Sequence, residues 1–67
     1  MISYEPLWLT MKEKGITTYR LINMYGISSH TIDSLRHNRS ITMKTLEEFC
    51  RILGCTANDV VRFEFEE

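Results

Sequence analysis

The sequence has no hydrophobic run that approaches the roughly 20 apolar residues a membrane-spanning helix needs. Its first residues also lack the charged and apolar regions of a secretory signal peptide. Apolar residues nevertheless make up 43% of the chain, which is ordinary for a globular protein and argues against disorder. These features predict a soluble protein of the cytoplasm.

Cysteine is scarce, with Cys50 and Cys55 as the only two. Without an export signal, they are predicted to be reduced thiols rather than a disulfide. A zinc site with His30 and His37 is not expected. The C-x4-C spacing is wider than the usual C-x2-C, and the histidines lie on another segment. We therefore predict no metal site and interpret both cysteines as small buried hydrophobic side chains.

The sequence also lacks the features of an enzyme. It has no glycine-rich loop for phosphates, no second carboxylate beside a nucleophile and, with 67 residues, no room for a sizeable pocket. We predict no catalysis and no cofactor. This length allows one domain, residues 1–67. A single core is marginal below roughly 70–80 residues, so either a covalent or metal staple or a partner chain is expected.

Charge is small in sum but uneven along the chain. The net charge of −1 by itself argues against a nucleic-acid partner. However, residues 1–44 contain six basic and three acidic side chains, whereas residues 45–67 contain two basic and six acidic ones. An anionic partner is therefore predicted to bind the first part of the chain.

Apolar residues at helical spacing predict two helices in the first part of the chain. The first helix ends at Gly15, after lysines that favour a helix C-terminus. The second starts at a cap formed by Thr17 or Thr18 and stops at Gly26. Its predicted inward-facing residues are Leu21, Ile22 and Tyr25.

A third helix, about residues 29–37, is predicted to begin after the N-cap Ser28. Ile27 and Ile32 occupy the positions of a hydrophobic staple, which fixes how the chain enters the helix. Asn38 tolerates the left-handed conformation that ends a helix.

Thr42 caps a predicted fourth helix that Gly54 closes, and Thr56 with Asp59 resembles a capping box that opens a short fifth helix. The apolar stripe of the fourth helix is Met43, Leu46, Phe49, Cys50 and Leu53. The predicted core of the whole chain consists of large apolar residues at helical spacing: Leu7, Trp8, Met11, Leu21, Ile32, Leu35, Leu46, Phe49 and Leu53.

The end of the sequence has a different period. Val61, Phe63 and Phe65 alternate with charged residues, which is typical of a strand. In one interpretation the two phenylalanines fold back onto the core of their own chain. In the other, which we favour slightly, this tail pairs with its copy in a two-fold dimer interface.

The stretch "YGISSHTIDSLRHN", residues 25–38, joins two short helices through Gly26. Its helix leaves a set of polar side chains on the outside: Ser29, His30, Asp33, Ser34 and His37. Such a helix fits a DNA major groove, where short polar side chains contact base edges. These histidines could equally be ordinary solvated surface residues, and the spacing around Gly26 favours DNA contact.

Residues 2–65 resemble the small Cro/C1-type, lambda-repressor-like helix-turn-helix regulators of bacteria, phages and mobile elements. The similarity lies in "KGITTYRLINMYGISSHTIDSLRHNRSITMKTLEEFCRILGC", flanked by "ISYEPLW" and "TANDVVRF". It implies an all-α, five-helix DNA-binding domain with a short, strand-like C-terminal tail and a helix-turn-helix at about 18–37. It also implies transcriptional control through double-stranded DNA, with a homodimer on a palindromic operator.

The resemblance also implies roles for single residues. Those expected at base edges are Ser29, His30 and Ser34. Those expected at the DNA backbone are Thr18, Ser28, Arg36, His37, Asn38 and Arg39. The family often has glutamine at the position of Thr18 and a small residue at that of Ile22. These differences predict a weaker phosphate contact and an outward shift of the second helix.

One alternative function stays open. The same fold could serve as a protein-interaction module, an antitoxin-like partner or an anti-repressor, that binds protein through its tail. The acidic second part of the chain favours this alternative, whereas the basic first part and the polar third helix favour DNA.

Overall fold

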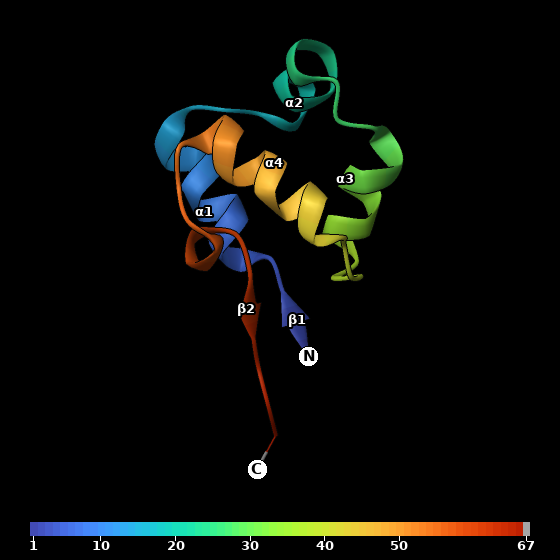
Figure 1. Cartoon of the computed structure of the whole chain (residues 1–67), viewed down its shortest axis with the longest axis vertical. Coiled ribbons are helices and arrows are strands. Elements are labelled where there is room, and N and C mark those ends of the chain that lie inside the picture. The colour runs from blue at the N-terminus through green and yellow to red at the C-terminus, as the bar shows by residue number, and fades with distance from the viewer. Residues whose placement is uncertain (67) are drawn as a thin grey trace.

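The computed structural model describes residues 1–66, which form a mainly helical fold with a small sheet (Figure 1). In chain order the elements are β1 (Ile2–Ser3), α1 (Glu5–Lys14), α2 (Thr18–Tyr25), α3 (Ser29–Arg36), α4 (Met43–Leu53), η1 (Ala57–Asp59) and β2 (Arg62–Phe63). Among these residues there are four α-helices rather than the expected five. The predicted fifth helix is η1, a single turn of 3₁₀ helix.

Hydroxyl side chains begin three of the helices, as the sequence predicts. Thr17, Ser28 and Thr42 each accept a hydrogen bond from the backbone N–H three residues further on, at 3.1–3.2 Å. Thr17, not Thr18, is the cap of α2. Each such bond satisfies one of the N–H groups that a helix N-terminus leaves unpaired.

The predicted capping box of Thr56 and Asp59 also forms, but it opens only the 3₁₀ turn. The backbone of this turn is fixed from α1, because the buried hydroxyl of Thr10 donates to the carbonyl of Asp59 at 2.8 Å. The turn is followed by Val60, which is fully buried, so η1 ends by bringing the chain back into the core.

One residue in the left-handed conformation precedes α3, and another follows it. Gly26 ends α2 with φ of 73°, and the N–H of Ile27 then donates to the carbonyl of Leu21 at 3.0 Å. Asn38 adopts φ of 54° after α3, the one non-glycine residue with positive φ among residues 1–66. Both residues were predicted to end helices in this way, and their conformations set the direction of the chain on each side of α3.

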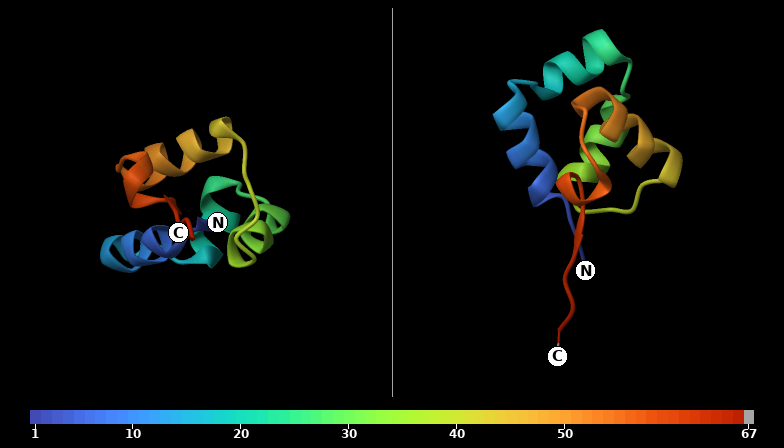
Figure 2. Two further views of the ribbon diagram at one scale, coloured as in Figure 1. Left: turned by 90° about the horizontal axis from the view of Figure 1, so that it is seen from below. Right: turned by 60° about the vertical axis from the view of Figure 1, so that its left-hand side comes forward.

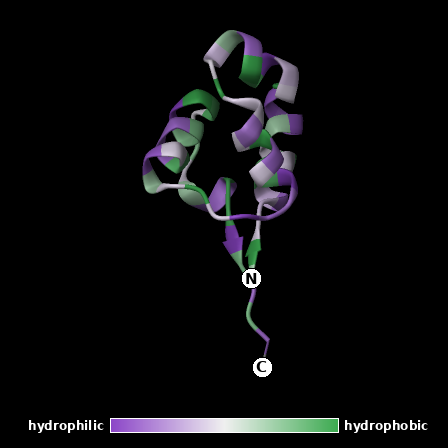
Figure 3. Ribbon diagram, turned by 90° about the vertical axis from the view of Figure 1, so that its right-hand side faces the viewer, coloured by the Kyte–Doolittle hydropathy of each residue, from purple (hydrophilic) through white to green (hydrophobic). Residues whose placement is uncertain are grey.

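The helices enclose one hydrophobic core. Its buried apolar residues are Tyr4, Leu7, Met11, Leu21, Ile27, Ile32, Leu35, Phe49, Leu53 and Val60. Seven of the nine predicted core residues are among them, whereas Trp8 and Leu46 are half-buried and pack against this core. Figure 3 shows the mixture of hydrophilic and hydrophobic residues along the helices that produces this arrangement.

Three predicted inward positions are wrong. Ile22 and Tyr25 are 37% and 43% exposed, because α2 lies at the edge of the molecule and buries only Leu21 (Figure 1). Met43 is 78% exposed, because it is the first residue of α4 and lies beyond the end of the core. Since Ile22 is partly in solvent, its bulk does not have to fit wholly between α2 and α3.

The strand-like character predicted for the end of the chain is confirmed at residues 62–63, which form β2. This strand pairs in antiparallel orientation with β1 of the same chain, in the register Ile2 with Phe63 and Ser3 with Arg62. Figure 1 shows the two strands side by side below the helices, and the right-hand view of Figure 2 shows the end of the chain running away from them. The phenylalanines do not return to the core, because Phe63 and Phe65 are 63% and 81% exposed.

Candidate nucleic-acid interface

The helix α3 has one fully apolar face and one polar face. Ile32 and Leu35 are 1% and 0% exposed, so they anchor the helix to the core. Positions 29, 30 and 33 therefore face outward, and these residues are exposed. α3 lies at a side of the molecule rather than between other helices (Figure 1). A whole helical face is thus open to a ligand.

The three residues predicted at base edges lie on this face and differ in how far they are exposed. Ser29 and His30 are exposed in the first turn of α3, where a helix approaches a groove end-on. Ser34 is only half-buried, four residues after His30, and follows on the same side of the helix. The structure therefore places the three side chains on the outer half of α3, with His30 and Ser34 as neighbours one turn apart.

Two of the predicted backbone-contacting residues join the two helices of the motif. The guanidinium of Arg36, at the end of α3, donates from Nη2 to Oγ1 of Thr18, at the start of α2, at 3.5 Å. This places a cation and a hydroxyl next to each other, a pair suited to one phosphate. Ser28 has a different role, since its hydroxyl is occupied as the cap of α3 and bonds Oγ1 of Thr31 at 2.9 Å.

Asp33 contacts two other residues predicted at the DNA backbone, His37 and Arg39. The ring Nδ1 of His37 lies 2.9 Å from the backbone carbonyl oxygen of Asp33 and 3.4 Å from its Oδ1. Nη1 of Arg39 lies 3.4 Å from Oδ2 of the same carboxylate. All three side chains are more than half exposed. The cationic end of α3 is therefore neutralised in part by its own helix.

Tyr4 positions the loop after α3, and sequence reasoning missed it. Its backbone N–H donates to Oδ1 of Asn38 at 3.3 Å, and its phenol donates to the carbonyl of Arg39 at 2.5 Å. The side chain is 1% exposed, and burial raises the pKa of its phenol, which therefore stays a neutral donor. The side-chain oxygen of Asn38 thus faces Tyr4, just before α1. Its amide nitrogen remains available to donate to a phosphate.

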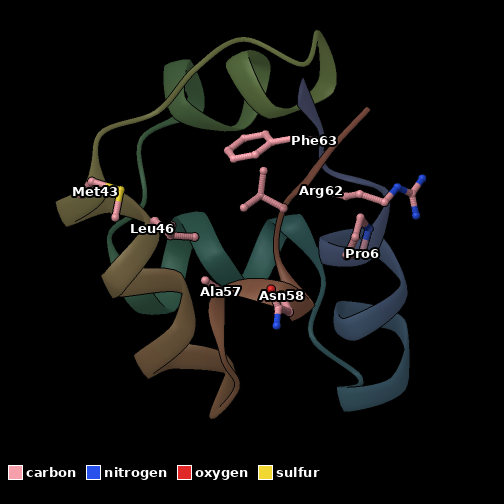
Figure 4. A pocket seen from close by; sticks show the side chains of 8 residues that line it. Pro6, Met43, Leu46, Ala57, Asn58, Arg62 and Phe63 are labelled. Atoms are coloured by element: carbon pink, nitrogen blue, oxygen red, sulfur yellow. The ribbon is translucent and has the colours of Figure 1, made fainter. Parts of the chain in front are cut away.

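A second surface lies beside the strand pair. A hollow of about 710 Å³ is lined by residues from α1, α4, η1 and β2: Pro6, Met43, Leu46, Ala57, Asn58, Val61, Arg62 and Phe63 (Figure 4). Of the predicted dimer-interface residues, Val61 and Phe63 line this hollow and Phe65 lies further along the exposed tail. Arg62 is held in place by Glu5 and Glu64, at 3.3 and 3.0 Å, and the bond to Glu64 raises the pKa of its guanidinium.

The cysteines are half-buried free thiols, as predicted for reduced residues. Burial, and then the neighbouring Cys50, raise the pKa of Cys55, which keeps this thiol protonated at neutral pH. In residues 1–66 no three histidine, cysteine or acidic side chains come close enough together to hold a metal ion. None of the helices described is long and apolar enough to cross a membrane.

Two short helices joined at a left-handed glycine, with the second helix polar on its outer face, define a helix-turn-helix DNA-binding domain. The model of the Cro/C1-type HTH DNA-binding domain family matches residues 6–66, nearly the whole chain. The chain therefore belongs to this family, as the sequence resemblance indicates.

A solved structure shows the same fold. The crystal structure of the transcriptional regulator VanUg, form II, superposes with a TM-score of 0.83 at 24% identity. The match covers 91% of this chain and 81% of that one. No curated protein sequence matches the chain.

Proposed function

We propose that this protein is a sequence-specific transcriptional regulator that places α3 in the major groove of double-stranded DNA. The observation that carries the proposal is the outer half of α3, which presents Ser29, His30 and Ser34 opposite the buried Ile32 and Leu35. Short polar side chains on such a helix reach base edges. VanUg, which has the same fold, is a transcriptional regulator, and this agrees with the proposal.

In the proposed complex, residues around α3 hold the DNA backbone. Thr18 and Arg36 together contact one phosphate, since they are already adjacent. His37, Asn38 and Arg39 contact the backbone beyond the other end of α3, where Tyr4 fixes the loop. Ser28 acts indirectly by capping α3. The motif at about 18–37 and the rest of the chain would act as one DNA-binding domain, at the nucleoid of a bacterial cytoplasm.

We further propose a homodimer on a palindromic operator. The partly buried Val61 and the exposed Phe63 line an apolar hollow, and the exposed Phe65 follows them along the tail. Exposed aromatic side chains of this kind favour a protein contact. Two-fold symmetry would place two copies of α3 about one DNA turn apart, roughly 34 Å. The dimer would double the number of base contacts on a symmetric site.

The test is fluorescence anisotropy of the purified protein with labelled duplexes. The duplexes come from the region upstream of its own gene and its neighbours, and from selection out of a randomised library, each at several salt concentrations. We expect tight binding to one sequence, with the logarithm of the affinity falling linearly with the logarithm of the salt concentration. Arg39→Ala should reduce this slope on the selected duplex by about 1. Arg51→Ala, an exposed position on α4, should not.

The competing function is a protein-interaction module, which the exposed Phe63 and Phe65 favour. It predicts no binding to any duplex at low salt. In that case, replacement of the two phenylalanines should abolish activity while changes on α3 have no effect. This pattern of results would contradict the proposed DNA-binding function.

A further inference from the structure

Asp33 stands out on the face of α3 that is proposed to meet DNA. It is the only acidic residue between Glu13 and Glu47, within the basic part of the chain. Its side chain is 52% exposed. In the helix it lies between the first turn of α3, which carries Ser29 and His30, and the loop that follows α3. A carboxylate at this position repels phosphate, so its presence on a DNA-binding face needs an explanation.

The contacts of Asp33 provide one. Its Oδ1 lies 3.4 Å from Nδ1 of His37 and its Oδ2 lies 3.4 Å from Nη1 of Arg39, so one carboxylate contacts both the imidazole and the guanidinium that follow α3. Exposed pairs at such distances are weak and are easily exchanged for a stronger partner. A phosphate placed close to Arg39 can therefore replace Asp33 as its ion-pair partner. A phosphate held further away forms a weaker ion pair and does not replace Asp33.

We propose that Asp33 determines specificity by making non-specific binding unfavourable, an inference that rests on the proposed function. In the free protein it withholds Arg39 and His37 from phosphates. In a complex with the wrong sequence its charge lies near the DNA backbone, within the roughly 8 Å over which charges act at physiological salt. Non-specific affinity is therefore reduced.

On the operator, Asp33 gains a partner. A carboxylate in the major groove accepts a hydrogen bond from the N4 amino group of cytosine. When α3 is in register, this bond offsets the loss of Arg39 and His37, which become free for phosphates. Asp33 then strengthens binding to one sequence and weakens binding to the others. The operator is therefore expected to contain a cytosine opposite Asp33.

The test is the variant Asp33→Asn, measured by anisotropy against the duplex selected with the wild-type protein and against a scrambled duplex of the same composition. We expect the ratio of the two affinities to fall by about tenfold, because the amide oxygen is a weaker acceptor for cytosine than the carboxylate and the scrambled duplex is no longer repelled. Affinity for the scrambled duplex should rise, and its salt slope should steepen by about 0.9 because Arg39 neutralises one more phosphate.

Glu47→Gln is the matched control, because it removes the same charge from an exposed position on α4. It should leave the affinity ratio unchanged. In the background of Arg39→Ala, the gain that Asp33→Asn produces on the scrambled duplex should shrink, since the residue that it releases is absent. This non-additivity distinguishes restraint of Arg39 from a change in net charge alone.

The possible results separate the two proposals. If the wild-type protein binds no duplex, the proposed function is wrong and this inference with it. If the wild-type protein binds one sequence tightly but Asp33→Asn and Glu47→Gln have equal effects on the ratio, only the role of Asp33 is overturned.

Discussion

The outer face of α3 and the strand pair β1–β2 are both open to solvent, and they differ in chemistry. α3 presents short polar groups above Ile32 and Leu35, which are buried and hold it in place. β2 is only two residues long and leaves Phe63 in solvent. A polar face on an anchored helix suits a ligand that itself stays hydrated, such as a DNA groove. An exposed aromatic side chain on a short strand suits a protein partner.

The largest effect is expected inside α3, where its two faces can be compared directly. Leu35→Ala should destabilise the fold by about 2–5 kcal/mol, because it leaves a cavity in the core. Ser29→Ala, on the outer face, should change stability by no more than about 0.5 kcal/mol. Urea denaturation followed by circular dichroism measures both. Equal losses would mean that the outer face of α3 also contributes to folding.

The strand pair should matter for association rather than for folding. We expect the double change Phe63→Ser and Phe65→Ser to weaken the homodimer by about 2 kcal/mol or more, as for aromatic residues at the centre of an interface. Sedimentation of the free protein and of its complex with a palindromic duplex reports this loss. Tyr19→Ser, which alters an aromatic residue on α2 that is 73% exposed, is the control and should leave association intact.

On α3, His30→Ala should lower discrimination between the selected and scrambled duplexes by about 1–3 kcal/mol, the loss of one base contact. Arg36→Ala, by contrast, should weaken binding to both duplexes to a similar degree, because phosphates are the same in every sequence. Competition anisotropy measures the two variants side by side. If Arg36→Ala altered discrimination and His30→Ala did not, the assignment of base and backbone contacts would be reversed.

The smallest effect is expected at Tyr4, which links the two regions, since it follows β1 directly and bonds the loop after α3. Tyr4→Phe removes the hydrogen bond to the carbonyl of Arg39 and should cost about 1 kcal/mol of stability. Amide hydrogen exchange of Asn38 and Arg39 should become faster. Tyr25→Phe, at an exposed tyrosine, should change neither quantity.

The features of the fold that could be predicted from the sequence are those with local causes. The caps Thr17, Ser28 and Thr42, and the left-handed residues Gly26 and Asn38, act within a few residues of their own position. For the same reason, the ends of α2 and α3 could be predicted from the sequence.

The features that could not be predicted depend on contacts between distant parts of the chain. No spacing links Tyr4 to Arg39, which is 35 positions away, and no pattern assigns β2 to β1. Helical periodicity gives the direction of Ile22 and Met43 but not whether another element covers them, and none does so fully. The contact of Asp33 with Arg39 depends on the turn of the chain at Asn38, whereas its contact with His37 is a local i, i+4 pair.

The pairing of β1 with β2 has a consequence for folding kinetics. It joins residues that are as many as 63 positions apart, so its formation closes almost the entire chain into a loop in return for a few hydrogen bonds. We expect this sheet to form last as the protein folds and to open first, while the helices stay intact. β2 could then pair with β1 of another molecule, and such a strand swap would cost little because the bonds broken are remade between the two chains.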